Sequence, residues 1–192
     1  MSTEFQCFDD PEAVFGKEFC LNALSKDLRG GLELGETREQ KCEKPRCTTL
    51  RTMHKLTVEI EGTHCDSPLA KALNGKLEAR LFTAFDTDGE HRGFHAGDFR
   101  WEGSGAVVVT GRMSGVTNEG THRQPIGECQ KCDDVGIFEG RLCGQVVETK
   151  YEELKECQIV AAYRIRFDSS TKGGSGTVTG TLEGVIICPC RG

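Results

Sequence analysis

The segment GIFEGRLCGQV (136–146) alternates glycine or apolar residues with mostly polar ones, and GTVTGTLEGVI (176–186) repeats the pattern forty residues later. In both segments the first, fifth and ninth residues are glycine. Looser copies are VVVTGRMSG (107–115) and GKLEARL (75–81). A period of two predicts half-buried β-strands. Glycine at every fourth position of one face removes bulk and permits strong bending, so the pattern favours a tightly coiled barrel.

The same alternation predicts about seven strands, at 54–61, 75–86, 93–101, 105–117, 136–148, 157–168 and 175–188. Turn residues separate several of them, as in TDGEHR (87–92) and SSTKGG (169–174). The simplest architecture is all-β, an antiparallel up-and-down barrel of seven to eight strands, with a β-sandwich as the alternative.

The N-terminal region is expected to differ from the barrel. Asp10 and Pro11 form a helix start signal and Gly30–Gly31 a stop, so one short helix is predicted between them. Residues 32–53 are polar and irregular. We therefore expect an N-terminal helix and cysteine-containing arm (1–53) and a barrel (54–192) within a single domain.

The glycine-rich strand GIFEGRLCGQVVE (136–148) resembles that of the allene oxide cyclase family, and the related dirigent proteins have a similar alternation. The likeness covers about a dozen residues directly and the copy at 174–186 more loosely. The resemblance implies a small, lipocalin-like antiparallel barrel that is often oligomeric and sometimes binds an apolar ligand inside. By the same resemblance, an isomerase or cyclase using the barrel interior is an alternative function.

Composition narrows the class of protein. The chain has 192 residues and a net charge of −6, which argues against nucleic-acid binding because such domains need a basic face. No apolar run approaches 18 residues, and the start of the chain is acidic where a signal peptide would be basic and then apolar. We therefore expect a cytoplasmic protein with neither nucleic acid nor membrane as a partner.

Eleven cysteines in a chain expected to be cytoplasmic need an explanation, because disulfides are rare there and paired cysteines more often bind metal. Counting strand directions sorts eight of them between the two barrel ends. Four thiolates around a tetrahedral Zn²⁺ make a closed structural site. The prediction is one or two structural zinc ions, a first site with Cys42, Cys47, Cys129 and Cys132, and a weaker second site with Cys65, Cys157, Cys188 and Cys190.

Other roles for the cysteines stay open. Cysteine-based redox chemistry or metal sensing would need exposed, reactive thiols instead of closed tetrahedra. The isolated Cys7, Cys20 and Cys143 are interpreted as buried packing residues.

Ligand-binding candidates come from the aromatic segment GFHAGDFRWEG (93–103) and from charged residues in mid-strand. His95 and Trp101 share one face of their strand, as in a pocket wall, although a tryptophan is more often a core residue. Arg141 and Arg164 would be solvated if their face lies outside, or would line an anion pocket if it lies inside. The sequence thus predicts a zinc-stabilised barrel that binds a small ligand or a protein partner. A glycine face on the exterior could also pack against another subunit, so a homo-oligomer is plausible.

Overall fold

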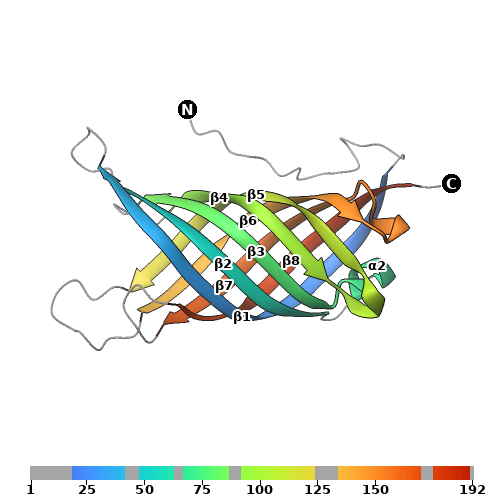
Figure 1. The fold of residues 1–192 in the computed structure, drawn as a ribbon, viewed down its shortest axis with the longest axis horizontal. Coiled ribbons are helices and arrows are strands. Elements are labelled where there is room, and N and C mark those ends of the chain that lie inside the picture. Colours follow the sequence, from blue (N-terminus) through green and yellow to red (C-terminus); the bar gives the residue numbers. More distant parts are fainter. Residues whose placement is uncertain are drawn as a thin grey trace.

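The computed structural model describes residues 19–41, 48–62, 67–86, 92–123, 134–169 and 175–190. Eight antiparallel strands form a closed barrel in which each strand pairs with its neighbours in the sequence and β8 pairs with β1 (Figure 1). The strands are β1 (Phe19–Lys41), β2 (Thr48–Gly62), β3 (Gly75–Asp86), β4 (Gly93–Glu102), β5 (Val108–Arg123), β6 (Asp134–Thr149), β7 (Gln158–Ser169) and β8 (Gly176–Pro189). The predicted all-β up-and-down barrel is confirmed.

In the described part of the chain, three short helical segments gather at one end of the barrel, the right end in Figure 1, which we call the plugged end. They are helix α2 (Pro68–Ala72) and the 3-10 turns η2 (Ser104–Ala106) and η3 (Glu152–Leu154). Helix α2 begins at its N-cap Ser67, whose hydroxyl accepts a hydrogen bond from the Ala70 amide at 3.1 Å. No helix among the described residues has the length and apolar content that crossing a bilayer requires.

The N-terminal prediction is wrong from residue 19 onward. Residues 19–41 form β1, the longest strand, so the barrel begins at Phe19 and not at 54. Leu24, Lys26 and Leu28 all point inward and are buried, which is a strand period of two. Because Lys26 interrupts the apolar alternation, the period of two is hidden in the sequence, and the remaining apolar residues have a spacing that predicts a helix. Residues 1–18, where the predicted helix would begin, lie outside the described residues.

The glycine face lies inside the barrel, where glycines make room for aromatic rings. A Cβ on Gly111 would lie 2.5 Å from the Phe99 ring, and one on Gly140 would lie 2.5 Å from the Tyr163 hydroxyl. These residues are direct neighbours across paired strands. A backbone carbonyl oxygen of a neighbouring strand would lie closer still, at 2.1 Å from either Cβ, and at Gly180 and Gly184 backbone atoms are the nearest neighbours. The recurring glycines therefore permit close approach of neighbouring backbone as well as of rings. The idea of a glycine-rich exterior that packs against a second subunit is therefore wrong.

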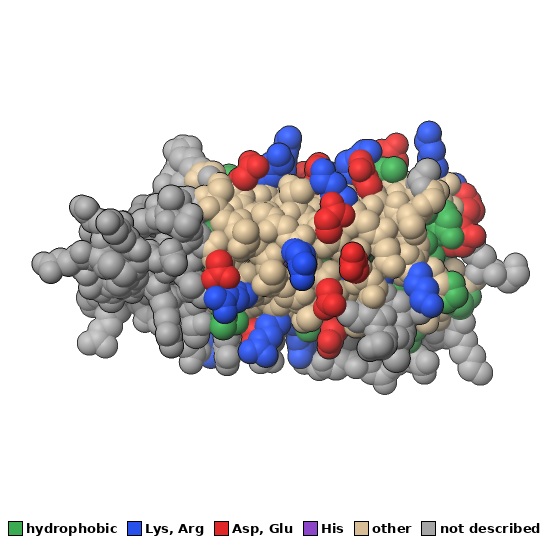
Figure 2. Space-filling model, turned by 90° about the horizontal axis from the view of Figure 1, so that it is seen from below, with side chains coloured by type: hydrophobic (Ala, Val, Ile, Leu, Met, Phe, Trp, Pro, Cys, Tyr) green, Lys and Arg blue, Asp and Glu red, His purple; other side chains and the backbone are tan. Residues whose placement is uncertain are grey.

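The outer wall is polar and charged. Opposite charges pair across strands, as between Arg164 and Glu139, whose nitrogen and oxygen lie 2.9 Å apart. On the face in Figure 2, acidic and basic side chains are interspersed and hydrophobic ones are few. Such exposed pairs each contribute little to stability, but their alternation with apolar residues fixes the register of the strands.

Candidate functional site in the barrel lumen

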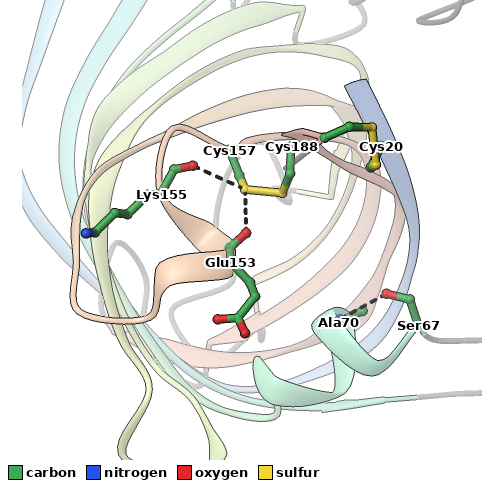
Figure 3. The surroundings of a disulfide bond; sticks show 8 residues. Cys20, Ser67, Ala70, Glu153, Lys155, Cys157 and Cys188 are labelled. Atoms are coloured by element: carbon green, nitrogen blue, oxygen red, sulfur yellow. Dashed lines mark hydrogen bonds between the residues drawn. A yellow bond between two sulfur atoms is a disulfide. The ribbon is translucent and has the colours of Figure 1, made fainter. Parts of the chain in front are cut away.

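Two disulfides between described residues fasten the plugged end. Cys20 bonds to Cys190 and Cys157 to Cys188, with Cα–Cα distances of 5.2 Å and 4.3 Å. The first joins the start of β1 to the end of β8, which closes the barrel. The second lies between β7 and β8 beside η3 and α2, and Figure 3 shows it at the end of the barrel. Cys157 and Cys188 are buried, whereas Cys20 and Cys190 are exposed.

The buried disulfide also contacts the chain that precedes β7. The Cys157 Sγ lies 3.1 Å from the Glu153 carbonyl oxygen and 3.8 Å from that of Lys155 (Figure 3). A disulfide sulfur carries no proton, so these are close contacts that would become hydrogen bonds only in the reduced thiol. The bond thus holds η3, with its buried Leu154, over the end of the barrel.

The prediction of structural zinc is wrong. Cys157, Cys188 and Cys190 of the second predicted site are consumed by disulfides. No cluster of three or more histidine, cysteine, aspartate or glutamate side chains able to hold a metal is found within the described ranges. The remaining predicted ligands lie outside those ranges: Cys42, Cys47, Cys65, Cys129 and Cys132.

The disulfides also contradict two other predictions. Disulfides form and persist in oxidising compartments, so the expectation of a cytoplasmic protein is wrong. Cys20 and Cys143 are disulfide-bonded and not free packing thiols, while Cys7 lies outside the described residues.

A band of polar side chains crosses the lumen, which is otherwise mainly apolar. His54 Nε2 lies 2.7 Å from the Thr83 hydroxyl, and Thr83 is the direct cross-strand neighbour of His95. The His95 ring packs edge-on against Tyr163, with ring centroids 5.5 Å apart. The Tyr163 hydroxyl in turn lies 2.8 Å from that of Thr117. We call these five residues the polar band.

Burial sets the charge state of the polar band. Desolvation lowers the pKa of both His54 and His95 from the ordinary 6.5 to about 4, so both rings are neutral near pH 7. Desolvation raises the pKa of Tyr163 to about 12, and the hydrogen bond with Thr117 opposes that rise. Lys26 is the one inward-facing charged side chain among those described, and its Nζ donates to Asn74 Oδ1 at 2.8 Å near the plugged end. The polar band therefore offers hydrogen bonds without charge.

One atom of the polar band has no partner. His54 Nδ1 is buried and makes no hydrogen bond within the described part of the chain. Its role depends on the tautomer: it donates if Nε2 accepts from Thr83, and it accepts if Nε2 donates. A buried polar atom without a partner costs free energy, so a hydrogen-bonding group of a bound molecule would be favoured there.

The lumen differs between its two halves. Near the plugged end most inward-facing side chains are buried, and Trp101 donates its indole N–H to the Leu73 carbonyl at 2.6 Å. Farther from α2, many inward-facing side chains remain partly exposed, although they pack against the core. They are Leu32, His54, Leu56, Leu81, Met113, Phe138, Leu142, Tyr163 and Ile165. A side chain that points inward and still contacts solvent borders space that water can enter. We call this half of the lumen the chamber.

The predicted ligand-binding residues fall in three different places. His95 belongs to the polar band, and Trp101 is a core residue that is 2% exposed at the plugged end. Arg141 and Arg164 point outward and line a hollow of about 550 Å³ in the outer wall. His95 is thus the one predicted residue that the structure brings to the chamber. His54, Thr83, Thr117 and Tyr163 were not predicted, because they are single polar residues on four different strands.

Comparisons with known proteins give no relative. No family model, no curated protein and no solved structure matches this chain.

Proposed function

We propose that this protein is a disulfide-stapled barrel of an oxidising compartment that binds one small, uncharged and mostly apolar molecule in the chamber. The carrying observation is that many side chains of the chamber face inward and yet remain partly exposed. The interior of an eight-stranded barrel is either filled by side chains or holds one small ligand, and barrel mouths are common sites of ligand binding.

The chemistry of the lining supports an uncharged ligand. Most of the lining is aliphatic or aromatic, and the polar band adds a few hydrogen-bonding groups. Ligand pockets commonly combine an apolar wall with a few such groups that fix orientation. Because both histidines are neutral near pH 7, the described side chains that line the chamber carry no charge to compensate the desolvation of a carboxylate or an amine. A molecule with one hydroxyl, carbonyl or N–H group fits this environment best.

The rigidity of the barrel favours binding. The Cys20–Cys190 and Cys157–Cys188 bonds close the barrel and hold η3 in place before any ligand arrives. A preformed site pays less conformational entropy on binding than a site that must be ordered.

The test is titration with N-phenyl-1-naphthylamine, a neutral, apolar probe with one N–H donor whose fluorescence rises in apolar surroundings. Saturable binding at one site per chain is expected. Leu142→Trp would fill the chamber and weaken binding at least tenfold. Val147→Trp is the matched control, because Val147 lies on the same strand, faces outward and is 65% exposed. Absence of saturable binding, or equal loss in both variants, would contradict the proposal.

A further inference from the structure

Apolar side chains gather on the outer wall of β2 to β5, away from the plugged end. Met53 and Phe94 are 48% and 51% exposed. The rings of Phe82 and Phe94 pack with centroids 6.1 Å apart. Met53 neighbours Phe82 across β2 and β3, and Phe94 neighbours Val116 across β4 and β5. These four residues form one continuous cluster, which we call the apolar patch. Elsewhere this wall carries mainly polar and charged residues, so such a cluster marks a surface that contacts something else.

A basic row lies directly beside the apolar patch. Toward the plugged end, the row follows the apolar patch by two residues on β2 and β3 and by four residues on β4 and β5. The outward positions of this row are Lys55, Arg80, Asp98 and Arg112, each paired with the next across β2 to β5. Three of the four are basic and one is acidic, a local charge of +2 in a chain whose net charge is −6. The ion pair in the row, between Arg112 and Asp98, is long at 3.9 Å and involves two side chains that are 81% exposed. Lys55 and Arg80 make no ion pair with another described residue.

The order of the two features along the barrel is informative. Two residues along a strand span roughly 7 Å, so the basic row lies about 7 Å from the apolar patch on β2 and β3 and about 14 Å from it on β4 and β5. A surface that meets a bilayer inserts its apolar side chains below the headgroups and places lysine and arginine at headgroup level. The apolar patch and the basic row have this arrangement.

We propose that the apolar patch and the basic row together dock the barrel on the surface of a membrane that contains anionic lipids. The sequence led us to expect no membrane partner, because no apolar run could span a bilayer. Docking on a surface needs no span. Membrane docking involves only side chains on the outer wall, whereas the proposed function concerns the lumen.

Other occupants fit the surface less well. A second copy related by a two-fold axis would bring two rows of charge +2 close together, and like charges repel. An extended peptide would need a free strand edge, and the closed barrel has none. A convex wall that exposes aromatic side chains beside basic ones can bind a flat anionic lipid surface without a strand edge or a complementary groove.

The first arm of the test is co-sedimentation of the oxidised protein with phosphatidylcholine vesicles, with and without phosphatidylserine. Binding is expected only with phosphatidylserine and should fall as salt rises. Lys55→Gln with Arg80→Gln should weaken binding about 25-fold, taking about fivefold for each basic residue. The control is Arg164→Gln, because that arginine is exposed but already paired with Glu139.

The second arm tests the apolar patch. Met53→Ser with Phe94→Ser should reduce binding to phosphatidylserine vesicles at least tenfold. Leu21→Ser is the control, because Leu21 is 37% exposed and lies on β1 near the plugged end. Thermal unfolding of each variant shows whether it remains folded.

Three results would overturn the inference. They are absence of binding to phosphatidylserine vesicles at low salt, equal binding by the variants and their controls, and a dimer in solution that Phe94→Ser dissociates. Binding of N-phenyl-1-naphthylamine without vesicles separates the two proposals. If the patch variants bind the probe but not the vesicles, both proposals hold. If the parent protein binds vesicles but not the probe, only the proposed function fails.

Discussion

The Cys20–Cys190 disulfide should supply a large part of the stability of the barrel, and removing it gives a quantitative test. The two cysteines are 170 residues apart, so the bond restricts nearly the whole unfolded chain. With the loop-entropy relation, a loop of that length corresponds to about 5 kcal/mol of unfolding free energy at 25 °C. Both side chains are exposed, so replacing them with serine adds little further cost. The double variant Cys20→Ser, Cys190→Ser should therefore unfold about 5 kcal/mol more easily than the parent.

The assay is equilibrium unfolding in urea, first without reductant and then with it. Without reductant the variant should unfold at a much lower urea concentration. With reductant the parent loses the same bond, so the difference between the two proteins should nearly vanish. A difference below about 1 kcal/mol without reductant would refute the loop-entropy reasoning. Intact masses that show both cysteines as free thiols in the parent would refute the disulfide itself.

Three further predictions concern the lumen and the plugged end. Because the pKa of His95 is lowered to about 4, the unfolded state binds a proton that the folded state rejects. The stability that neutral His95 contributes is then fully present above about pH 6.5 and falls by roughly 3 kcal/mol as the pH drops to 4. The melting temperature of His95→Gln should therefore fall less over this pH range than that of the parent protein. Gly140→Ala should cost about 1–3 kcal/mol in chemical denaturation because its Cβ would overlap the Val116 carbonyl oxygen and the Tyr163 hydroxyl, whereas at Gly31 the nearest atom is 3.6 Å away and alanine should be tolerated. Trp101→Phe leaves the carbonyl at the C-cap of α2 without its buried donor, and should lower the unfolding free energy by about 2 kcal/mol in the same assay.

Much of the fold could be predicted from residues that repeat at fixed spacing. Alternation located seven of the eight strands, because each has one polar face and one face of apolar residues and glycine. It failed for β1, where Lys26 occupies an inward position among leucines. A buried lysine is tolerated there because its amine reaches Asn74 from the segment after α2, a contact that sequence alone does not reveal.

The candidate site was harder to predict because no local motif encodes it. His54 and Thr83 are on neighbouring strands, and Tyr163 is more than a hundred residues from His54. Counting strand directions correctly placed Cys157, Cys188 and Cys190 at one end of the barrel, but it did not include Cys20, because β1 was not expected. With Cys20 at that end, each of Cys157, Cys188 and Cys190 has a disulfide partner, and the second zinc site loses three of its four ligands.

The sequence by itself determined the period of the strands, their antiparallel order and the spacing of the glycines, because these depend on neighbouring residues along one strand. Only the tertiary structure decided which face is inside. Strand closure brings Phe99 over Gly111 and Tyr163 over Gly140, and these rings fit only where the glycines leave room. Barrel closure also decided the partners of the cysteines, because it brings distant residues together. It likewise decided the neutral state of His54 and His95, because it removes both rings from water.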